Sequence, residues 1–259
     1  MIIKQDFLCS PVGKNRPLHI YLPPEYDAPW AASARYPVMY FFDGQNLFYD
    51  GDATYGKCWG LKGFLDGWEK PLIIVGIECG HEGRERLNEY SPYYFNSGYI
   101  GRVDGIGDSI LSWIETEVKP VIDARFRTWP HREATGIGGS SMGGLMSFYG
   151  VLKYNHVFSK AACLSPTVIP CYRKLCREIR EAALHPDTRI WLSYGEEEAY
   201  YRSGRVPLSE TKADRYLERI LSLLADKGVM TRKYVQPGGG HSEAFWEKQL
   251  PAVMEYLWM

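Results

Sequence analysis

The sequence predicts an α/β fold in which helices cover both faces of a mostly parallel sheet. Strand-like and helix-like segments alternate from about residue 134 to the C-terminus, as they do when each parallel strand is followed by a crossover helix. The apolar runs at 36–42 and 72–77 are continuous, which is typical of strands buried on both faces. The two earliest strand-like segments precede this alternation, so we expect them to form an antiparallel edge.

Each expected element follows from a local pattern. The first two strands lie at 2–8 and at 18–22, where a pair of prolines ends the second. The helix at 109–122 carries apolar side chains on one face, namely Ile110, Ile114, Val118 and Val121. Further strands are expected at 134–138, 160–164, 189–194 and 232–236, and further helices at 145–152, 171–183, 209–226 and 243–257. We interpret the helix at 171–183 as packed on the sheet, the alternative being a small cap over the site.

Length and composition predict one domain that spans residues 1–259. Hydrophobic residues make up 45% of the chain and charged residues 24%, so there is enough apolar material for a large core. The formal net charge of −1 favours neither nucleic acid nor an anionic membrane as a partner. Oligomeric state stays open, a homo-oligomer included.

Signals for export, metals and nucleotides are weak in this sequence. Residues 1–7 carry charges where a secretory signal would be apolar, and no run of about 18 apolar residues occurs. The six cysteines are scattered without pairing or ligand spacing, so we expect reduced thiols, no metal site and a cytoplasmic protein. The run 51–58 approaches a phosphate-binding loop, but Cys58 stands where the hydroxyl should be. We therefore expect no cofactor.

The strongest functional motif is a G-x-S-x-G pattern centred on Ser141, between an expected strand and an expected helix. This arrangement holds a serine on a tight turn with its hydroxyl exposed for attack. The turn forces the serine into strained torsions, and side chains two positions away would collide with it, so glycine is needed at Gly139 and Gly143. The motif predicts a nucleophilic serine.

A histidine and a carboxylate are expected to complete the site. Parallel strands end at one edge of the sheet, so the loops that leave this edge carry the chemistry. His241 follows a glycine-rich loop after the last strand and would accept the proton of the serine. The turn after the preceding strand offers Glu196, Glu197 and Glu198. We choose Glu198, because its spacing carries the carboxylate past the strand end toward the histidine, and the other two stay open as alternatives.

Substrate contacts are expected from backbone amides and aromatic rings. The oxyanion hole takes one N–H from the residue after the nucleophile, Met142, and one from the loop after the strand 36–42, where we favour Gln45. Trp59 and Tyr200 are candidates to line an acyl or aromatic pocket, with ordinary loop packing as the alternative.

With these motifs the chain resembles the putative esterase family, which includes esterase D, feruloyl esterases, enterochelin esterases and mycolyltransferases. The segments that carry the resemblance are 36–48, 89–92, 117–123, 138–144 and 240–246, and it covers the chain from about residue 35 to the C-terminus. It implies the α/β-hydrolase fold and hydrolysis of small-molecule carboxylic esters. The family's functional positions fall on Ser141, His241, Gln45 and Met142. Some relatives of the enterochelin esterases manage without a well-placed acid.

Two other functions fit the same residues or the same fold. An acyltransferase would differ only in whether an alcohol outcompetes water for the acyl group. A non-catalytic binding module on this fold usually lacks the serine or the histidine, and both are present here.

Overall fold

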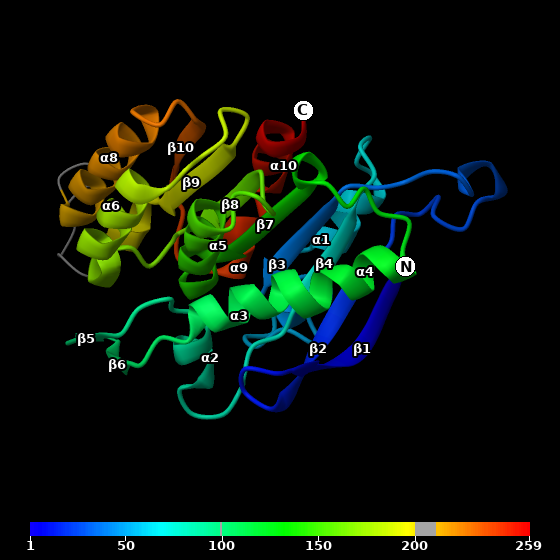
Figure 1. Ribbon diagram of the computed structural model, residues 1–259, viewed down its shortest axis with the longest axis horizontal. Coiled ribbons are helices and arrows are strands. Elements are labelled where there is room, and N and C mark those ends of the chain that lie inside the picture. Colours follow the sequence, from blue (N-terminus) through cyan, green and yellow to red (C-terminus); the bar gives the residue numbers. More distant parts are fainter. Residues whose placement is uncertain (99, 200–210) are drawn as a thin grey trace.

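A computed structural model describes residues 1–98, 100–199 and 211–259, and one large sheet runs through this part of the chain (Figure 1). Within it the strands lie in the order β1-β2-β4-β3-β7-β8-β9-β10. Their bounds are β1 Ile2–Cys9, β2 Lys14–Tyr21, β3 Val38–Phe42, β4 Ile73–Ile77, β7 Thr135–Ser140, β8 Lys160–Leu164, β9 Arg189–Gly195 and β10 Met230–Gln236. β2 runs antiparallel to both neighbours, and every pair from β4 to β10 is parallel. The expected sheet with its antiparallel N-terminal edge is confirmed.

The sheet separates two hydrophobic cores, because alternate residues of a strand point to opposite faces. In β3, Val38, Tyr40 and Phe42 belong to the larger core. Met39 and Phe41, between them, belong to the smaller core on the other face. Burial on both faces explains why this strand reads as a continuous apolar run.

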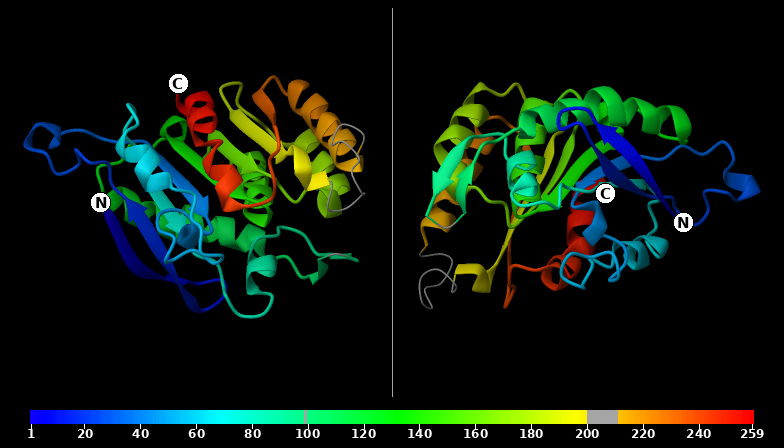
Figure 2. Two further views of the ribbon diagram at one scale, coloured as in Figure 1. Left: turned by 180° about the vertical axis from the view of Figure 1, so that it is seen from behind. Right: turned by 90° about the horizontal axis from the view of Figure 1, so that it is seen from below.

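Helices cover both faces of the sheet. Side chains of α3, α4, α5, α6 and α8 enter the larger core, and those of α1, α9 and α10 enter the smaller one. Seen from below, the green helices α3 and α4 and the red C-terminal helices lie on opposite sides of the sheet (Figure 2). The bounds are α1 Leu61–Asp66, α2 Glu85–Glu89, α3 Gly107–Trp113, α4 Lys119–Arg125, α5 Met142–Lys153, α6 Tyr172–Glu181, α8 Lys212–Ala225, α9 Glu243–Glu247 and α10 Leu250–Trp258.

Three helices test the sequence-based expectations in detail. The helix expected at 109–122 is confirmed, and it runs from α3 through a π-helical turn, Ile114–Val118, into α4. α6 buries Leu175 and Ile179 in the larger core, as the packed interpretation predicts. The single helix expected at 243–257 is wrong: α9 ends at Glu247 and α10 begins at Leu250. Pro251 lies in the first turn of α10, where a proline favours the start of a helix.

Several short elements were not expected from the sequence. They are α1, α2 and a small antiparallel hairpin of β5 Phe95–Ser97 and β6 Gly101–Val103. Each is too short to carry a clear hydrophobic period. All six cysteines are buried and free. In the described ranges no helix is long and apolar enough to cross a membrane.

Candidate active site

Ser141 lies on the turn between β7 and α5, and its backbone is strained. Its φ of 57° and ψ of −118° are torsions that a residue with a side chain rarely adopts. Two hydrogen bonds fix the turn, from Ser141 N to Leu164 O at 2.9 Å and from Thr167 N to Ser141 O at 3.0 Å. Ser141 is partly exposed, whereas its neighbours Ser140 and Met142 are buried. The turn therefore presents this one side chain at the N-terminus of α5.

The glycines around Ser141 are required by contact distances. A Cβ on Gly139 would lie 2.8 Å from the carbonyl carbon of Gly143, and a Cβ on Gly143 would lie 2.9 Å from Phe42 Cβ. Both distances are shorter than real Cβ contacts, so glycine is required at both positions. The expected reason is wrong, because the added side chains would collide with Gly143 and Phe42 and not with the serine. The helix behind them is buried on nearly all sides, since every residue of α5 except Lys153 is buried.

His241 lies in the loop between β10 and α9, where Glu198 contacts its ring. His241 Nδ1 is 2.9 Å from Glu198 Oε2. The imidazole is 44% exposed, and the carboxylate side chain is only 10% exposed. The Trp246 ring packs edge-on against the imidazole with 5.1 Å between ring centroids. A carboxylate on Nδ1 favours the tautomer in which Nε2 can accept a proton.

The structure distinguishes the three glutamates of the short 3-10 turn Glu196–Ala199. Glu198 alone of the three contacts His241. Glu196 Oε2 accepts a hydrogen bond from Gly238 N at 2.9 Å, so it stabilises the loop that carries His241. Glu197 is exposed and holds the same loop only through its backbone, whose N–H donates to Gly239 O at 2.8 Å. The geometry thus favours the choice of Glu198 as the acid.

Ser165 is a site residue that the sequence did not indicate. It follows β8, its φ is 47°, and its Oγ donates to Glu198 Oε1 at 2.5 Å. Ser165 Oγ also accepts a hydrogen bond from Trp246 Nε1 at 2.9 Å. Gly195 N adds a second donor to Glu198 Oε1 at 2.8 Å. These bonds orient the Glu198 carboxylate so that its other oxygen faces the imidazole.

Ser141 and His241 lie at the same edge of the sheet, joined by a short path of contacts. Ser141 N bonds to Leu164 O, the next residue Ser165 bonds to Glu198, and Glu198 contacts His241. Within the described residues there is no hydrogen bond between Ser141 Oγ and His241 Nε2. Contacts between nucleophile and base are often loose in a free enzyme and tighten when substrate binds.

The two expected oxyanion donors lie in loops that flank this edge. Met142 is the first residue of α5, so its N–H has no acceptor within the helix. Gln45 is the central residue of a 3-10 turn, Gly44–Asn46, directly after β3. Its side chain is buried, and Nε2 donates to Thr54 Oγ1 at 3.3 Å. In the described part of the chain neither amide donates to another backbone group.

A partly buried ion pair fixes the start of the Gln45 turn. Asp43 adopts a left-handed conformation with φ 59°. Arg86 of α2 donates from Nε and Nη2 to the two carboxylate oxygens of Asp43, both at 2.7 Å. Burial lowers the pKa of Arg86, but the Asp43 carboxylate outweighs burial and raises this pKa above its ordinary value. Asp43 N also donates to the Tyr90 hydroxyl at 3.0 Å.

The two aromatic pocket candidates have different outcomes. Trp59 is 2% exposed in the smaller core and packs against Phe41 and Trp246, with 5.8 Å between ring centroids in each pair. Its burial leaves no face for a substrate and fits the packing alternative. Tyr200 lies outside the described residues.

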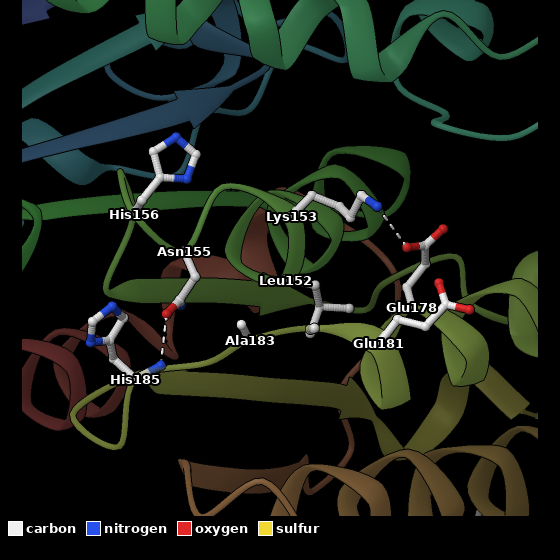
Figure 3. A pocket seen from close by; sticks show the side chains of 9 residues that line it. Leu152, Lys153, Asn155, His156, Glu178, Glu181, Ala183 and His185 are labelled. Atoms are coloured by element: carbon white, nitrogen blue, oxygen red, sulfur yellow. Dashed lines mark hydrogen bonds and ion pairs between the residues drawn. The ribbon is translucent and has the colours of Figure 1, made fainter.

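A cavity of about 420 Å³ lies at the far end of α5 (Figure 3). Lys153 and Glu178 form an ion pair across it at 3.1 Å, and Asn155 Oδ1 accepts a hydrogen bond from His185 N. α5 has 12 residues. At about 1.5 Å of rise per residue, the cavity is therefore roughly 18 Å from Ser141. It is not part of the candidate active site.

The sheet, the strained serine turn and the carboxylate–histidine pair define an α/β-hydrolase. The chain belongs to the esterase family described as "Putative esterase", whose model matches residues 10–257. It is a carboxylic ester hydrolase, as the resemblance seen in the sequence implies.

Relatives of known sequence or structure match this chain over nearly its whole length. The "Uncharacterized protein YbbA" of Bacillus subtilis is 27% identical over 252 residues, which are 94% of this chain and 93% of that protein. An IroE-like serine hydrolase from Shewanella oneidensis has a TM-score of 0.76 at 19% identity, over 98% of this chain and 79% of that one. The siderophore hydrolase EstA from Aspergillus nidulans has a TM-score of 0.72 at 17% identity, over 99% and 94%. At these identities the two structures show the fold.

Proposed function

We propose that the protein hydrolyses small-molecule carboxylic esters through an acyl-enzyme on Ser141, with His241 as general base and Glu198 as the acid that orients it. The observation that carries this proposal is the positive φ of Ser141 on a strand-turn-helix junction. Strain of this kind persists where the surrounding structure enforces it, and it concentrates at functional sites. The Glu198–His241 pair at the same edge supplies the base that such a serine requires.

The chemistry proceeds in two steps. Ser141 Oγ attacks the carbonyl carbon as its proton passes to His241 Nε2, and the carbonyl electron pair moves to the oxygen. Collapse of this intermediate expels the alcohol, which takes the proton from Nε2. Water then attacks the acyl-enzyme in the same way and releases the acid. Glu198 stabilises the imidazolium formed in each step.

The charge on the carbonyl oxygen is met by the N–H groups of Gln45 and Met142. Such donors act strongly because they are already oriented before the charge develops. Met142 also lies at the N-terminus of α5, where the helix dipole favours negative charge. The bonds that fix Asp43 hold the Gln45 turn in place.

Replacing Ser141 tests the nucleophile. Ser141→Ala should lower kcat for p-nitrophenyl butyrate by about a millionfold if the three residues act as a unit. The adjacent Ser140→Ala is the matched control and should keep most of the activity. A fluorophosphonate probe should add one adduct to wild type and to Ser140→Ala, and none to Ser141→Ala. A labelled or active Ser141→Ala enzyme would reject the assignment.

Replacing the acid tests Glu198 against its neighbour. Glu198→Gln should lower kcat by about ten-thousandfold, because the amide cannot stabilise the imidazolium. Glu197→Gln removes an exposed carboxylate from the same turn and should leave kcat within a factor of a few. The opposite ranking of the two variants would transfer the acid role to Glu197.

Products assayed with an added alcohol separate hydrolysis from transfer. We expect the free acid to dominate, and a predominant new ester would make the protein an acyltransferase.

We also propose that residues 1–259 form one domain, since a single large sheet runs through the described ranges.

The six buried thiols support a reducing, cytoplasmic setting, and burial raises the pKa of Cys9 to about 12. Detection of a disulfide in the native protein would count against this setting.

A further inference from the structure

Glu243 is a buried carboxylate that the proposed mechanism does not use. It is the first residue of α9, two positions after His241, and it is 6% exposed. Its Oε1 accepts a hydrogen bond from Asn46 Nδ2 at 3.2 Å. A buried acidic side chain is costly unless it is paired. Its position beside the histidine therefore calls for an explanation.

Asn46 belongs to the turn that carries Gln45, and it is itself firmly held. Its Oδ1 accepts a hydrogen bond from Thr54 N at 2.9 Å, and its backbone carbonyl accepts one from Trp59 N at 2.8 Å. The bond to Glu243 joins residues 197 positions apart in the chain. It therefore ties the loop after β10, which carries His241, to the loop after β3, which carries the oxyanion donor.

Glu243 also shares its surroundings with other charges. Burial raises the pKa of Glu243, and the nearby Asp43 carboxylate raises it further, while His241 and Arg86 lower it.

We propose that Glu243 is a positioning residue for ester hydrolysis: its hydrogen bond to Asn46 holds the histidine loop against the oxyanion loop. This inference rests on the proposed function of Ser141 and His241. It assigns one contribution to the Glu243 side chain. The hydrogen bond sets the position of the base relative to the oxyanion donors.

Two variants test this role. Glu243→Gln keeps an oxygen that can accept the bond from Asn46, and Glu243→Ala removes it. Glu247→Gln is the matched control, because Glu247 lies on the same helix but pairs with Lys57 at 2.7 Å and is 39% exposed. Kinetics with p-nitrophenyl butyrate give kcat and KM separately for each variant.

Glu243→Gln should keep kcat within a factor of a few of wild type, because the bond from Asn46 can still form. Glu243→Ala should lower kcat about a hundredfold with a smaller change in KM, because small displacements of catalytic groups are costly. Glu247→Gln should match wild type in both respects. Urea unfolding of each variant shows whether it is folded under the assay conditions.

A Glu243→Ala enzyme with the kcat of Glu243→Gln would overturn the positioning role. Fluorophosphonate labelling of wild type distinguishes this failure from a failure of the proposed function. If Ser141 is not labelled, the proposed function fails. If Ser141 is labelled and Glu243→Ala keeps the kcat of wild type, only the role of Glu243 is rejected.

Discussion

Removing the Arg86 side chain would measure how far the oxyanion loop depends on one ion pair. Arg86 makes two hydrogen bonds to Asp43 at 2.7 Å, and the side chains are 33% and 6% exposed respectively. Arg86→Met keeps much of the apolar stem and removes the guanidinium, whose Cζ lies 5.3 Å from the centroid of the Tyr90 ring. It leaves the Asp43 carboxylate buried without its counter-ion.

The size of the effect follows from this burial. Removing one partner of a fully buried pair costs about 3–5 kcal/mol, because the remaining charge is uncompensated. Solvent reaches one third of the Arg86 side chain, so we expect about 2–3 kcal/mol, at or below the lower end of that range. The Gln45 turn begins at Asp43, and a looser turn should lower kcat about a hundredfold. KM should change less, since the donors act mainly on the transition state.

Urea unfolding and ester kinetics on the same preparations provide the measurement. The double variant Asp43→Asn with Arg86→Met removes both charges, and asparagine tolerates the positive φ at position 43. It should be more stable than Arg86→Met alone, because no buried charge remains. The reasoning is refuted if Arg86→Met unfolds within about 0.5 kcal/mol of wild type, the scatter expected of an ordinary surface substitution. It is refuted equally if adding Asp43→Asn lowers stability further.

Two further predictions concern Ser165 and Lys160. Ser165→Ala removes a donor to Glu198 and the acceptor of Trp246 Nε1. The free energy of unfolding should therefore be about 1–3 kcal/mol lower than in wild type, and kcat should fall. If urea unfolding and ester kinetics give the values of wild type, these bonds are dispensable. Burial, and then the nearby Arg189, lower the pKa of Lys160 to about 8 from 10.5. Because the folded state releases this proton first, the unfolding free energy of wild type relative to Lys160→Met should rise between about pH 8 and 10.5. A flat difference would mean that Lys160 titrates normally.

Local constraints explain what could be predicted from the sequence. The serine turn is defined by glycines two positions from Ser141, and the contacts of those glycines come from the turn itself and from β3 beside it. Buried parallel strands leave an apolar run that no surface strand would have, so β3 and β4 were found. The break before α10 had a signal too, since Pro251 marks a helix start that the apolar period concealed.

Contacts between distant segments explain what could not be predicted. Ser165 meets Glu198 across 33 positions, and Arg86 meets Asp43 across 43. Neither pair has a spacing that marks it, because each partner follows a different strand and the length of the crossover segment between the strands is not fixed by the fold. Trp59 shows the converse limit: an aromatic residue near a site looks the same in sequence whether it faces a substrate or, as here, packs into a core.

In the residues that the structure describes, the strained non-glycine backbone lies where the chemistry is proposed. Asp43, Ser141 and Ser165 are the non-glycine residues with positive φ in the described part of the chain. They follow β3, β7 and β8, which are consecutive in the sheet. Each conformation costs of order 1–3 kcal/mol and persists only where neighbouring bonds enforce it. At Asp43 the conformation is held by the bonds from Arg86. At Ser141 it is held by the backbone bonds to Leu164 and Thr167. At Ser165 it is held by the side-chain bonds to Glu198 and Trp246. Strain repeated at three adjacent strand ends, with separate compensation at each, is better explained by a shared function than by three independent accidents of packing.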